Sequence, residues 1–498
     1  MEQLTKRILA IVLIAVVGVG VGITVWIFVA PYNWTYRDCP GAPEDITSDQ
    51  IIRIGVLGGM TDIQGKGAWE GAYLAAKDIN EAGGVVVGGK QYYIGVTNED
   101  TQESYTSLDT AAGVSAAQRI INYKKVQFTL GGFRSEAVLA YQEVIMDNKI
   151  IYISTGPATN VFTMNVNGFA AGDYPSEGLV DYPGSNYNRY KYYFRATPIN
   201  STALGGEILG MVAGLIKQIN ATVPQNLTKL SIIREDLTWT VGLAYAVENN
   251  LLALAAAIGY PGLEVVEHIA YPITTAAATF TTYMNTINSS GTQILIPIIS
   301  AQGGQYMTQA YAALKPNFTI IGIDVQGQLE SYWGDTNGDC AFETMMQTVT
   351  DTNRTSKTQA FWDDYVDLWG DSPLYTATGG YDAVYQLLYA INGSQSFDSD
   401  DVVAELETIT VDNPLTGVGS VFAYTDNHDV VEGWPHGLAL FCQWLPTANP
   451  LVGNKTIVKS PITYWPIGAG RIGKLYPDDL IGVANYQLPT WTGWAFNS

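Results

Sequence analysis

Cysteine, histidine and basic side chains are scarce in this sequence. Three cysteines and three histidines occur in 498 residues, with no CxxC and no Cys/His cluster, so a zinc site has no support. Lys and Arg together number 25 against 47 Asp and Glu, which gives a formal net charge of −22. A surface of that sign repels phosphate backbones, which excludes nucleic acid as a partner, and it suits anionic lipid headgroups poorly.

Motifs that mark several enzyme classes are also missing. The patterns GxSxG, Walker A and HExxH do not occur, and His268, His428 and His436 are scattered along the chain. We therefore expect a protein that is not an enzyme and that holds no cofactor or metal ion. Residues 335–339 have the spacing of a calcium loop, but Cys340 stands where that loop has glycine, so a polar turn is the better interpretation.

Length and composition indicate a folded protein with more than one core. Hydrophobic residues make up 47% and aromatic residues 11% of the chain, which excludes a disordered protein. A single core stops growing at roughly 250–300 residues. At 54.0 kDa this chain is predicted to form two lobes.

The N-terminal region has the features of a membrane anchor. Residues 8–30 carry no charge, and Lys6 and Arg7 precede them. A helix rising 1.5 Å per residue over that length crosses about 30 Å of hydrocarbon. The basic pair predicts that the N-terminus lies on the inner side of the cell membrane and that everything after the single pass is extracellular. Residues 31–50, which contain several Pro and Gly, are expected to be a linker.

Potential glycosylation sites support the extracellular placement. The asparagines of N-x-[ST] sequons are Asn33, Asn200, Asn220, Asn226, Asn288, Asn317, Asn353, Asn392 and Asn454. An uncleaved anchor, an acidic surface and many sequons together are typical of an archaeal glycoprotein. In an exported protein three cysteines allow one disulfide, and we expect it between Cys340 and Cys442.

Short apolar runs alternate with segments of helical periodicity from residue 51 onwards. Residues 51–57 fit a buried strand and residues 67–80 a helix, and similar pairs recur to about residue 392. Such alternation predicts parallel sheets with right-handed crossovers. The expected division is residues 51–195 and 326–425 for lobe 1, residues 196–325 and 426–446 for lobe 2, and residues 447–498 for a C-terminal extension.

Two loops after predicted strands contain small and polar residues. Residues 131–136 read Gly-Gly-Phe-Arg-Ser-Glu, and residues 154–159 read Ser-Thr-Gly-Pro-Ala-Thr. In open parallel sheets ligands bind beyond the carboxyl ends of the strands. Backbone N–H groups and the Ser135 hydroxyl at a helix start suit a carboxylate, although Ser135 is equally typical of an ordinary N-cap.

The order of segments resembles a known family. The segments that carry the resemblance are Ile54-Gly-Val-Leu-Gly58 and, after it, Gly71-Ala-Tyr-Leu-Ala-Ala-Lys-Asp-Ile-Asn-Glu-Ala-Gly-Gly84. Residues 193–197 and 433–444 resemble later segments of the same family. Over roughly residues 51–445 the chain resembles type I periplasmic binding proteins of the Leu/Ile/Val-binding class. The resemblance implies an α/β fold of two doubly wound parallel-sheet lobes joined by hinge crossovers.

The resemblance also implies roles for individual residues. Ser135 would bind the carboxylate of the ligand, with Gly156 and Thr159 beside it. Asp324 would pair with the ligand ammonium, since a buried ammonium needs an acidic partner. The alternative for Asp324 is a turn residue.

Two more positions complete the predicted site. Trp239 would close over the ligand from the second lobe, and Gln64 is a weaker candidate in the first loop. The alternative for Trp239 is a core tryptophan at a helix start.

By the same resemblance, the expected function is that of a solute-binding protein of an ABC importer. It would capture an amino acid or an amino-acid-like molecule by hinge closure and deliver it to the permease subunits. A ligand-sensing receptor ectodomain and a glycosylated structural cell-surface protein remain the alternatives.

Overall fold

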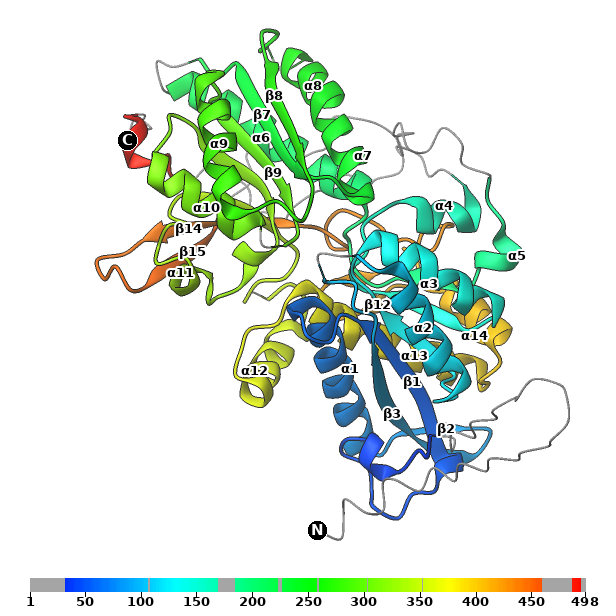
Figure 1. Ribbon diagram of the computed structural model, residues 1–498. Helices are drawn as coiled ribbons and strands as arrows, with labels where there is room; N and C mark the ends of the chain where they lie inside the picture. The colour runs from blue at the N-terminus through cyan, green and yellow to red at the C-terminus, as the bar shows by residue number, and fades with distance from the viewer. Residues whose placement is uncertain are drawn as a thin grey trace, which may run out of the picture.

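Two α/β lobes make up the computed structural model (Figure 1). The structure describes residues 32–105, 108–168, 184–222, 226–257, 259–301, 303–351, 353–458 and 486–493. The expected anchor at residues 8–30 lies outside them. Within the described ranges, no helix combines the length and the apolar character that crossing a membrane requires.

The first lobe is built on a six-stranded sheet. Its order is β2 (Val85–Val87), β3 (Lys90–Asp100), β1 (Ile51–Gly58), β4 (Phe128–Gly131), β5 (Ile151–Ser154) and β6 (Tyr193–Arg195). Strands β3, β1, β4, β5 and β6 are parallel, and β2 is antiparallel to β3.

Helices cover both faces of this sheet. They are α1 (Ile63–Glu81), α2 (Thr110–Asn122), α3 (Ser135–Asp147), α4 (Val161–Asn167), α5 (Tyr187–Tyr190), α12 (Thr358–Trp369), α13 (Tyr375–Ser394) and α14 (Ser399–Leu406). Helix α1 packs closely on α13, because a Cβ atom at Gly71 would lie 1.9 Å from the Ala377 carbonyl oxygen. Only glycine permits that approach.

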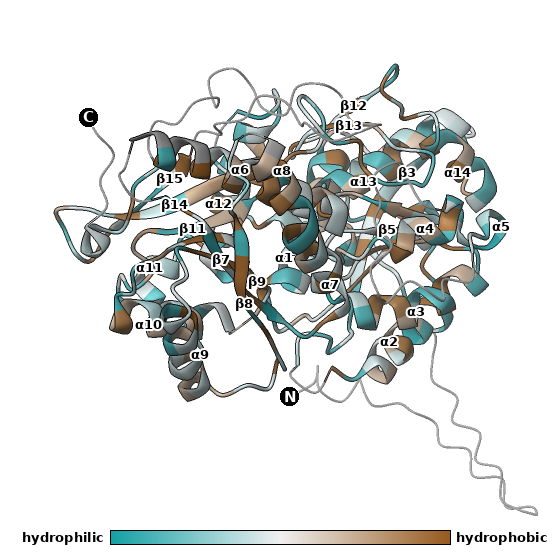
Figure 2. Ribbon diagram, turned by 90° about the horizontal axis from the view of Figure 1, so that it is seen from above, coloured by the Kyte–Doolittle hydropathy of each residue, from teal (hydrophilic) through white to brown (hydrophobic). Residues whose placement is uncertain are grey.

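The second lobe contains a seven-stranded sheet. Its order is β15 (Gly453–Val458), β14 (Leu440–Pro446), β11 (Glu343–Gln347), β10 (Thr319–Asp324), β9 (Ile294–Ile299), β7 (Lys229–Glu235) and β8 (Glu264–Tyr271). Every residue of β9 is buried, and the strand is largely brown in Figure 2. An apolar strand buried on both faces is typical of a parallel sheet covered by helices.

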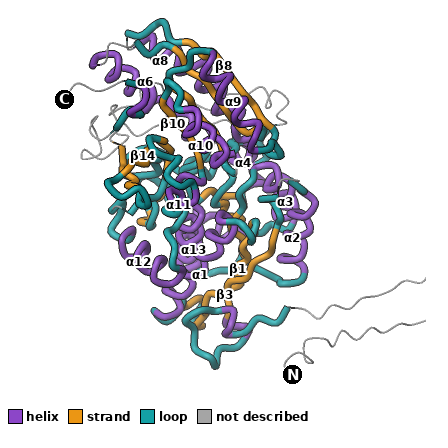
Figure 3. The backbone as a smooth tube through the Cα atoms, turned by 60° about the vertical axis from the view of Figure 1, so that its left-hand side comes forward, coloured by secondary structure: helices purple, strands orange, loops and turns teal. Residues whose placement is uncertain are grey.

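The covering helices of the second lobe come from one continuous stretch of the chain. They are α6 (Ser201–Thr222), α7 (Thr238–Ala246), α8 (Leu252–Ala257), α9 (Ala277–Ser289), α10 (Gly303–Leu314) and the short α11 (Tyr332–Asp335). Figure 3 shows the two lobes one above the other.

Strand β11 corrects the expected division of the chain. Residues 326–425 were assigned to lobe 1, but β11 pairs with β10 and β14 in the second sheet. Both sheets are mixed rather than wholly parallel, because β2, β14 and β15 join as antiparallel strands. The chain returns to the first lobe only at α12.

Both ends of the described chain pack on the lobes. The linker expected at residues 31–50 is not a free spacer in its described part: the Trp34 side chain is 4% exposed and its Nε1 donates to the Lys124 carbonyl at 2.6 Å. In the C-terminal extension, β15 extends the second sheet and Trp491 Nε1 donates to the Pro316 carbonyl at 2.9 Å.

The expected disulfide between Cys340 and Cys442 is wrong. All three cysteines are free and buried. Cys442 faces Met345 across the β14–β11 ladder, and Cys340 packs in a cluster with Trp444. Trp444 is two residues beyond Cys442 on the same face of the strand, so the indole occupies the space beside Cys340.

Three segments cross between the lobes. The chain passes from β6 to α6, from β11 to α12, and back through residues 431–439 to β14. The second and third crossovers contact each other, because Arg354 Nη2 donates to the Leu438 carbonyl at 2.8 Å. These crossovers place the carboxyl ends of β4, β5, β7, β9 and β10 around the space between the lobes.

Candidate functional site

A cavity lies between the lobes at the ends of these strands. The space between its lining atoms is about 560 Å³, its open mouth included. The first lobe contributes Phe133, Arg134, Gly156, Ala158 and Tyr375. The second lobe contributes Leu204, Trp239, Ser300, Ile323, Val325, Gln328 and Met346, and Ile199 and Thr348 come from the crossovers.

Most of the cavity wall is apolar. Phe133 and Trp239 are each 6% exposed, and Met346 is 2% exposed. These side chains belong to the same hydrophobic cluster as Ile323 and Val325, so one apolar core spans both lobes. A ligand in this cavity is therefore surrounded by both lobes at once.

Arg134 is the one cationic side chain on the wall among the described residues. It is 4% exposed, and its Cζ lies 6.0 Å from the centroid of the Phe133 ring. Its Nε and Nη1 atoms are buried and have no hydrogen-bond partner in the described part of the chain. The guanidinium thus presents unused donors in an apolar setting.

Two buried acids lie behind this arginine. Glu103 Oε2 accepts from the backbone N–H groups of Phe133 (3.3 Å) and Arg134 (3.1 Å), so it holds the loop rather than the guanidinium. Burial raises the pKa of Glu103 to about 7, and the charge of Arg134 acts against that rise.

Glu235, at the end of β7, is the second acid. Its carboxylate accepts from Ser300 Oγ at 2.5 Å and from the Ala301 N–H at 3.1 Å. Burial raises its pKa, and Arg134 favours the ionised form. Ser300 thus lies between this carboxylate and the cavity.

Two of the six predicted site residues line the cavity. Gly156 is one of them. A Cβ atom at this position would be 2.3 Å from the Gly132 carbonyl oxygen, so there is no room for a larger residue. Trp239 lies on the opposite wall, in the first turn of α7. Their roles toward a ligand stay predictions.

Three other predicted residues support the site from outside the cavity wall. Ser135 Oγ accepts from the Thr159 N–H at 3.3 Å, so these residues join the two loops to each other. The Gln64 amide lies 2.6 Å from the Asp62 carboxylate. None of the three is on the wall that the described residues form.

Asp324 corrects the predicted ammonium partner. Its neighbours Ile323 and Val325 line the cavity, and alternate residues of a strand point to opposite faces. The Asp324 carboxylate is fully buried on the other side, where it accepts from the Tyr332 hydroxyl at 2.7 Å. It therefore belongs to the interior of the second lobe and not to the shared cavity.

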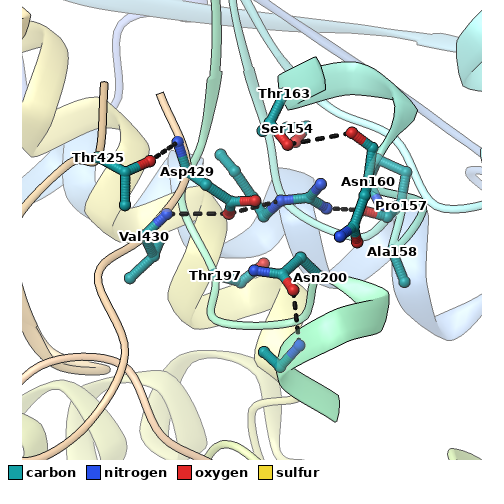
Figure 4. Close-up of polar contacts among 12 residues, drawn as sticks. Ser154, Pro157, Ala158, Asn160, Thr163, Thr197, Asn200, Thr425, Asp429 and Val430 are labelled. Carbon is teal, nitrogen blue, oxygen red and sulfur yellow. Dashed lines mark hydrogen bonds and ion pairs between the residues drawn. The ribbon is translucent and has the colours of Figure 1, made fainter. Parts of the chain in front are cut away.

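The loop after β5 is held by a buried arginine at the first crossover. Arg195 Nη2 donates to the Thr159 carbonyl at 3.0 Å, Nη1 donates to the Pro157 carbonyl, and Nε lies 3.0 Å from Asp429 Oδ1. Figure 4 shows Asp429 and Pro157 on either side of this cluster. The arrangement fixes the loop that supplies Gly156 and Ala158 to the cavity.

Asn200 corrects one of the predicted glycosylation sites. It is 8% exposed, and its Nδ2 donates to Glu432 Oε1 at 3.0 Å. A glycan is attached at Nδ2, which is occupied and enclosed here. Seven other sequon asparagines are exposed, and their modification stays a prediction: Asn33, Asn226, Asn288, Asn317, Asn353, Asn392 and Asn454.

The described residues contain no group of three His, Cys, Asp or Glu side chains that could hold a metal ion. Sequence reasoning missed Arg134, Tyr375, Met346 and Thr348 as cavity residues. Arg134 was visible inside the loop at residues 131–136, but only its serine neighbour was interpreted as a carboxylate binder.

Comparison with known proteins agrees with this architecture. No curated protein matches the sequence. A substrate-binding protein of an ABC transporter from Desulfitobacterium hafniense, solved with Leu, has 18% identity and a TM-score of 0.57 over 82% of this chain and 100% of that chain. A solute-binding protein from R. palustris, solved with benzoate, has 14% identity and a TM-score of 0.61 over 87% of this chain and 100% of that chain.

A third solved structure has the same fold. It is a solute-binding protein from Rhodopseudomonas palustris BisB5 with 3,4-dihydroxybenzoic acid, at 16% identity and a TM-score of 0.59 over 83% of this chain and 99% of that chain. The family model described as periplasmic binding protein matches residues 51–435. The chain therefore belongs to the periplasmic binding protein family, whose members bind solutes and are not enzymes.

Proposed function

We propose that this protein is the extracytoplasmic solute-binding component of an ABC importer. It captures a small carboxylic acid, either an amino acid of the Leu/Ile/Val type or an aromatic acid, and delivers it to the permease subunits. The N-terminal segment at residues 8–30 anchors it in the cell membrane with the two lobes outside.

The cavity between the lobes is the observation that carries this proposal. Trp239 and Ile323 from one lobe face Phe133 and Tyr375 from the other across the same space. A ligand that contacts both walls favours the closed arrangement, because the open arrangement loses half of those contacts. Three crossovers provide the hinge.

The similar structures support both the transport context and the ligand class. They are solute-binding proteins of ABC transporters, solved with leucine, with benzoate or with 3,4-dihydroxybenzoic acid. A mostly apolar wall with few polar groups suits the side chain of leucine and the ring of a benzoate alike.

Thermal unfolding of the purified full-length protein tests the proposal. A panel of amino acids, benzoates and phenylalkanoates is added in excess, and at 100 times Kd a true ligand stabilises the folded state by about 2.7 kcal/mol. The matched control is Ala158→Phe, which fills the cavity and should abolish the shift.

The proposal fails if no small carboxylic acid raises the melting temperature. It also fails if the shift persists unchanged in the filled variant. If cross-linking on intact cells then showed this protein in regular arrays, a structural role at the cell surface would be favoured instead.

A further inference from the structure

The Arg134 guanidinium is buried without a partner for two of its donors. Nε and Nη1 make no hydrogen bond in the described part of the chain, and the side chain is 4% exposed. Buried donors of a charged group that make no hydrogen bond are costly, because they have lost water without a replacement partner, even with the carboxylates of Glu103 and Glu235 nearby. A ligand that brings an anionic group to this point offsets that cost.

The neighbouring acids do not satisfy the guanidinium. Glu103 accepts from the backbone of its own loop, and Glu235 accepts from Ser300 and the Ala301 N–H. Both carboxylates are thus engaged elsewhere, while Arg134 lines the cavity. Its planar donor fork matches a carboxylate in a two-point geometry.

The same cavity offers little to an ammonium group. None of the fourteen described lining residues is an aspartate or glutamate. Of the polar ones, Ser300 donates its hydroxyl to Glu235, and Gln328 Nε2 donates to the Met346 carbonyl at 2.9 Å. Thr348 Oγ1 is a neutral hydroxyl without a partner in the described part of the chain, and it carries no charge to balance an ammonium. Asp324 faces the interior of the second lobe, away from the cavity.

Aromatic side chains surround the rest of the space. Phe133 and Tyr375 come from the first lobe and Trp239 from the second. Aromatic rings pack well against other rings in offset or edge-to-face arrangements. The walls therefore suit an aryl group better than a polar one.

We propose that the ligand is an aryl or arylalkyl monocarboxylate without an α-ammonium group, and that Arg134 binds its carboxylate. The inference rests on the proposed solute-binding function and narrows its substrate class. Recognition combines one charged contact from the first lobe with aromatic contacts from both.

Calorimetry with three ligands of nearly equal shape tests this assignment. The full-length protein is titrated with 3-phenylpropanoate, with phenylalanine, which adds the ammonium, and with 3-phenylpropanamide, which removes the charge. We expect 3-phenylpropanoate to bind at least about tenfold more tightly than either analogue.

Variants of the arginine provide the second arm. Arg134→Met is expected to weaken 3-phenylpropanoate binding at least about tenfold and to remove the preference for the acid over the amide. Arg134→Lys retains the charge and restores part of the affinity. The control Arg189→Met removes a surface arginine that pairs with Glu143 and Asp147, and binding stays within about twofold.

The outcomes separate the two proposals. Phenylalanine binding as tightly as 3-phenylpropanoate, or tighter, overturns the ligand class and leaves the solute-binding function in place. Equal binding of the acid and the amide overturns the role of Arg134. If no member of the larger acid panel binds, the solute-binding function itself fails. Because the ligand comparison uses the unaltered protein, it stands even where Arg134→Met folds poorly.

Discussion

Arg195 Nε lies 3.0 Å from Asp429 Oδ1, in a buried ion pair at the hinge between the lobes. Arg195 ends β6 at the first crossover, and Asp429 lies just before the third. The same guanidinium donates to two carbonyl oxygens of the loop that follows β5. One side chain thus ties two crossover segments to a wall of the cavity.

Removal of this arginine is expected to destabilise the protein. Arg195→Met leaves Asp429 as an uncompensated buried charge, and breaking a buried pair costs about 3–5 kcal/mol. The free energy of unfolding in urea measures the effect. Arg189→Met, which breaks only surface ion pairs, serves as the control and should cost about 0–1 kcal/mol. Equal losses in the two variants would contradict the assignment.

A contact across the lobes should influence closure. Glu136 Oε1 accepts from the Thr238 N–H at 2.6 Å; Glu136 is in the first turn of α3 in the first lobe, and Thr238 begins α7 in the second. Glu136→Ala removes a bond available only when the lobes are close, so Kd for 3-phenylpropanoate should rise about three- to tenfold.

Glu143 provides the matched control for this contact. It lies on the same helix but pairs with Arg189 at the surface. Glu143→Ala should leave Kd unchanged while Glu136→Ala raises it. The same affinity in both variants would show that the Glu136 contact does not favour the closed state.

Trp239 should account for a large part of the apolar contribution to binding. It is nearly fully buried on the cavity wall. Trp239→Ala removes that wall, and we expect a rise in Kd of about ten- to one hundredfold for 3-phenylpropanoate by calorimetry. Trp239→Phe keeps a ring there and should lose less. A larger loss of affinity in Trp239→Phe than in Trp239→Ala would exclude direct packing of this side chain on the ligand.

Stability should depend on pH through a buried acid pair in the second lobe. Glu343 Oε2 accepts from Thr308 Oγ1 at 2.7 Å, and Asp324 accepts from Tyr332. Burial first, and then the Asp324 charge, hold the pKa of Glu343 well above its usual value. When the folded-state pKa of a carboxyl group is raised in this way, the group's contribution to stability is fully present below the unfolded pKa of about 4.3. That contribution is lost as pH rises through the folded pKa.

Neutralisation of this acid should remove part of that pH dependence. Glu343→Gln is expected to raise the unfolding free energy at pH 8 by about 1–3 kcal/mol and to change it little at pH 4. Urea unfolding at both values measures the difference. The surface variant Glu81→Gln, which only loses a pair with Lys77, should be flat across the range. If the unfolding free energies of Glu343→Gln and of the unaltered protein differ by the same amount at pH 4 and at pH 8, Glu343 is not a source of the pH dependence.

Local patterns predicted much of the fold. The expected strand at 51–57 lies within β1 and the expected helix at 67–80 lies within α1, because the periodicity of each is carried by neighbouring residues. Strand β11 was missed. Its sequence, Glu-Thr-Met-Met-Gln, has a weak strand preference, and its extended form comes from pairing with β10 and β14.

The site was harder to predict than the fold. The sequence singled out Gly156 in a loop and Trp239 as the residue that closes over the ligand, and both line the cavity. It could not assign the face of β10 to which Asp324 belongs, because a shift of one position in a strand exchanges the cavity for the core. Arg134 looked like an ordinary loop arginine, because its burial comes from tertiary packing that no local pattern shows.

The order of segments by itself determined the family and the two-lobed architecture, because periodicity and turn residues act over short distances. The tertiary structure alone decided which side chains share the cavity. It turned Asp324 inward, enclosed Arg134 with two of its donors unbonded, and occupied the Asn200 amide. Which side chains are buried, and which face of a strand meets the cavity, depend on contacts between residues hundreds of positions apart, and no local pattern shows these contacts.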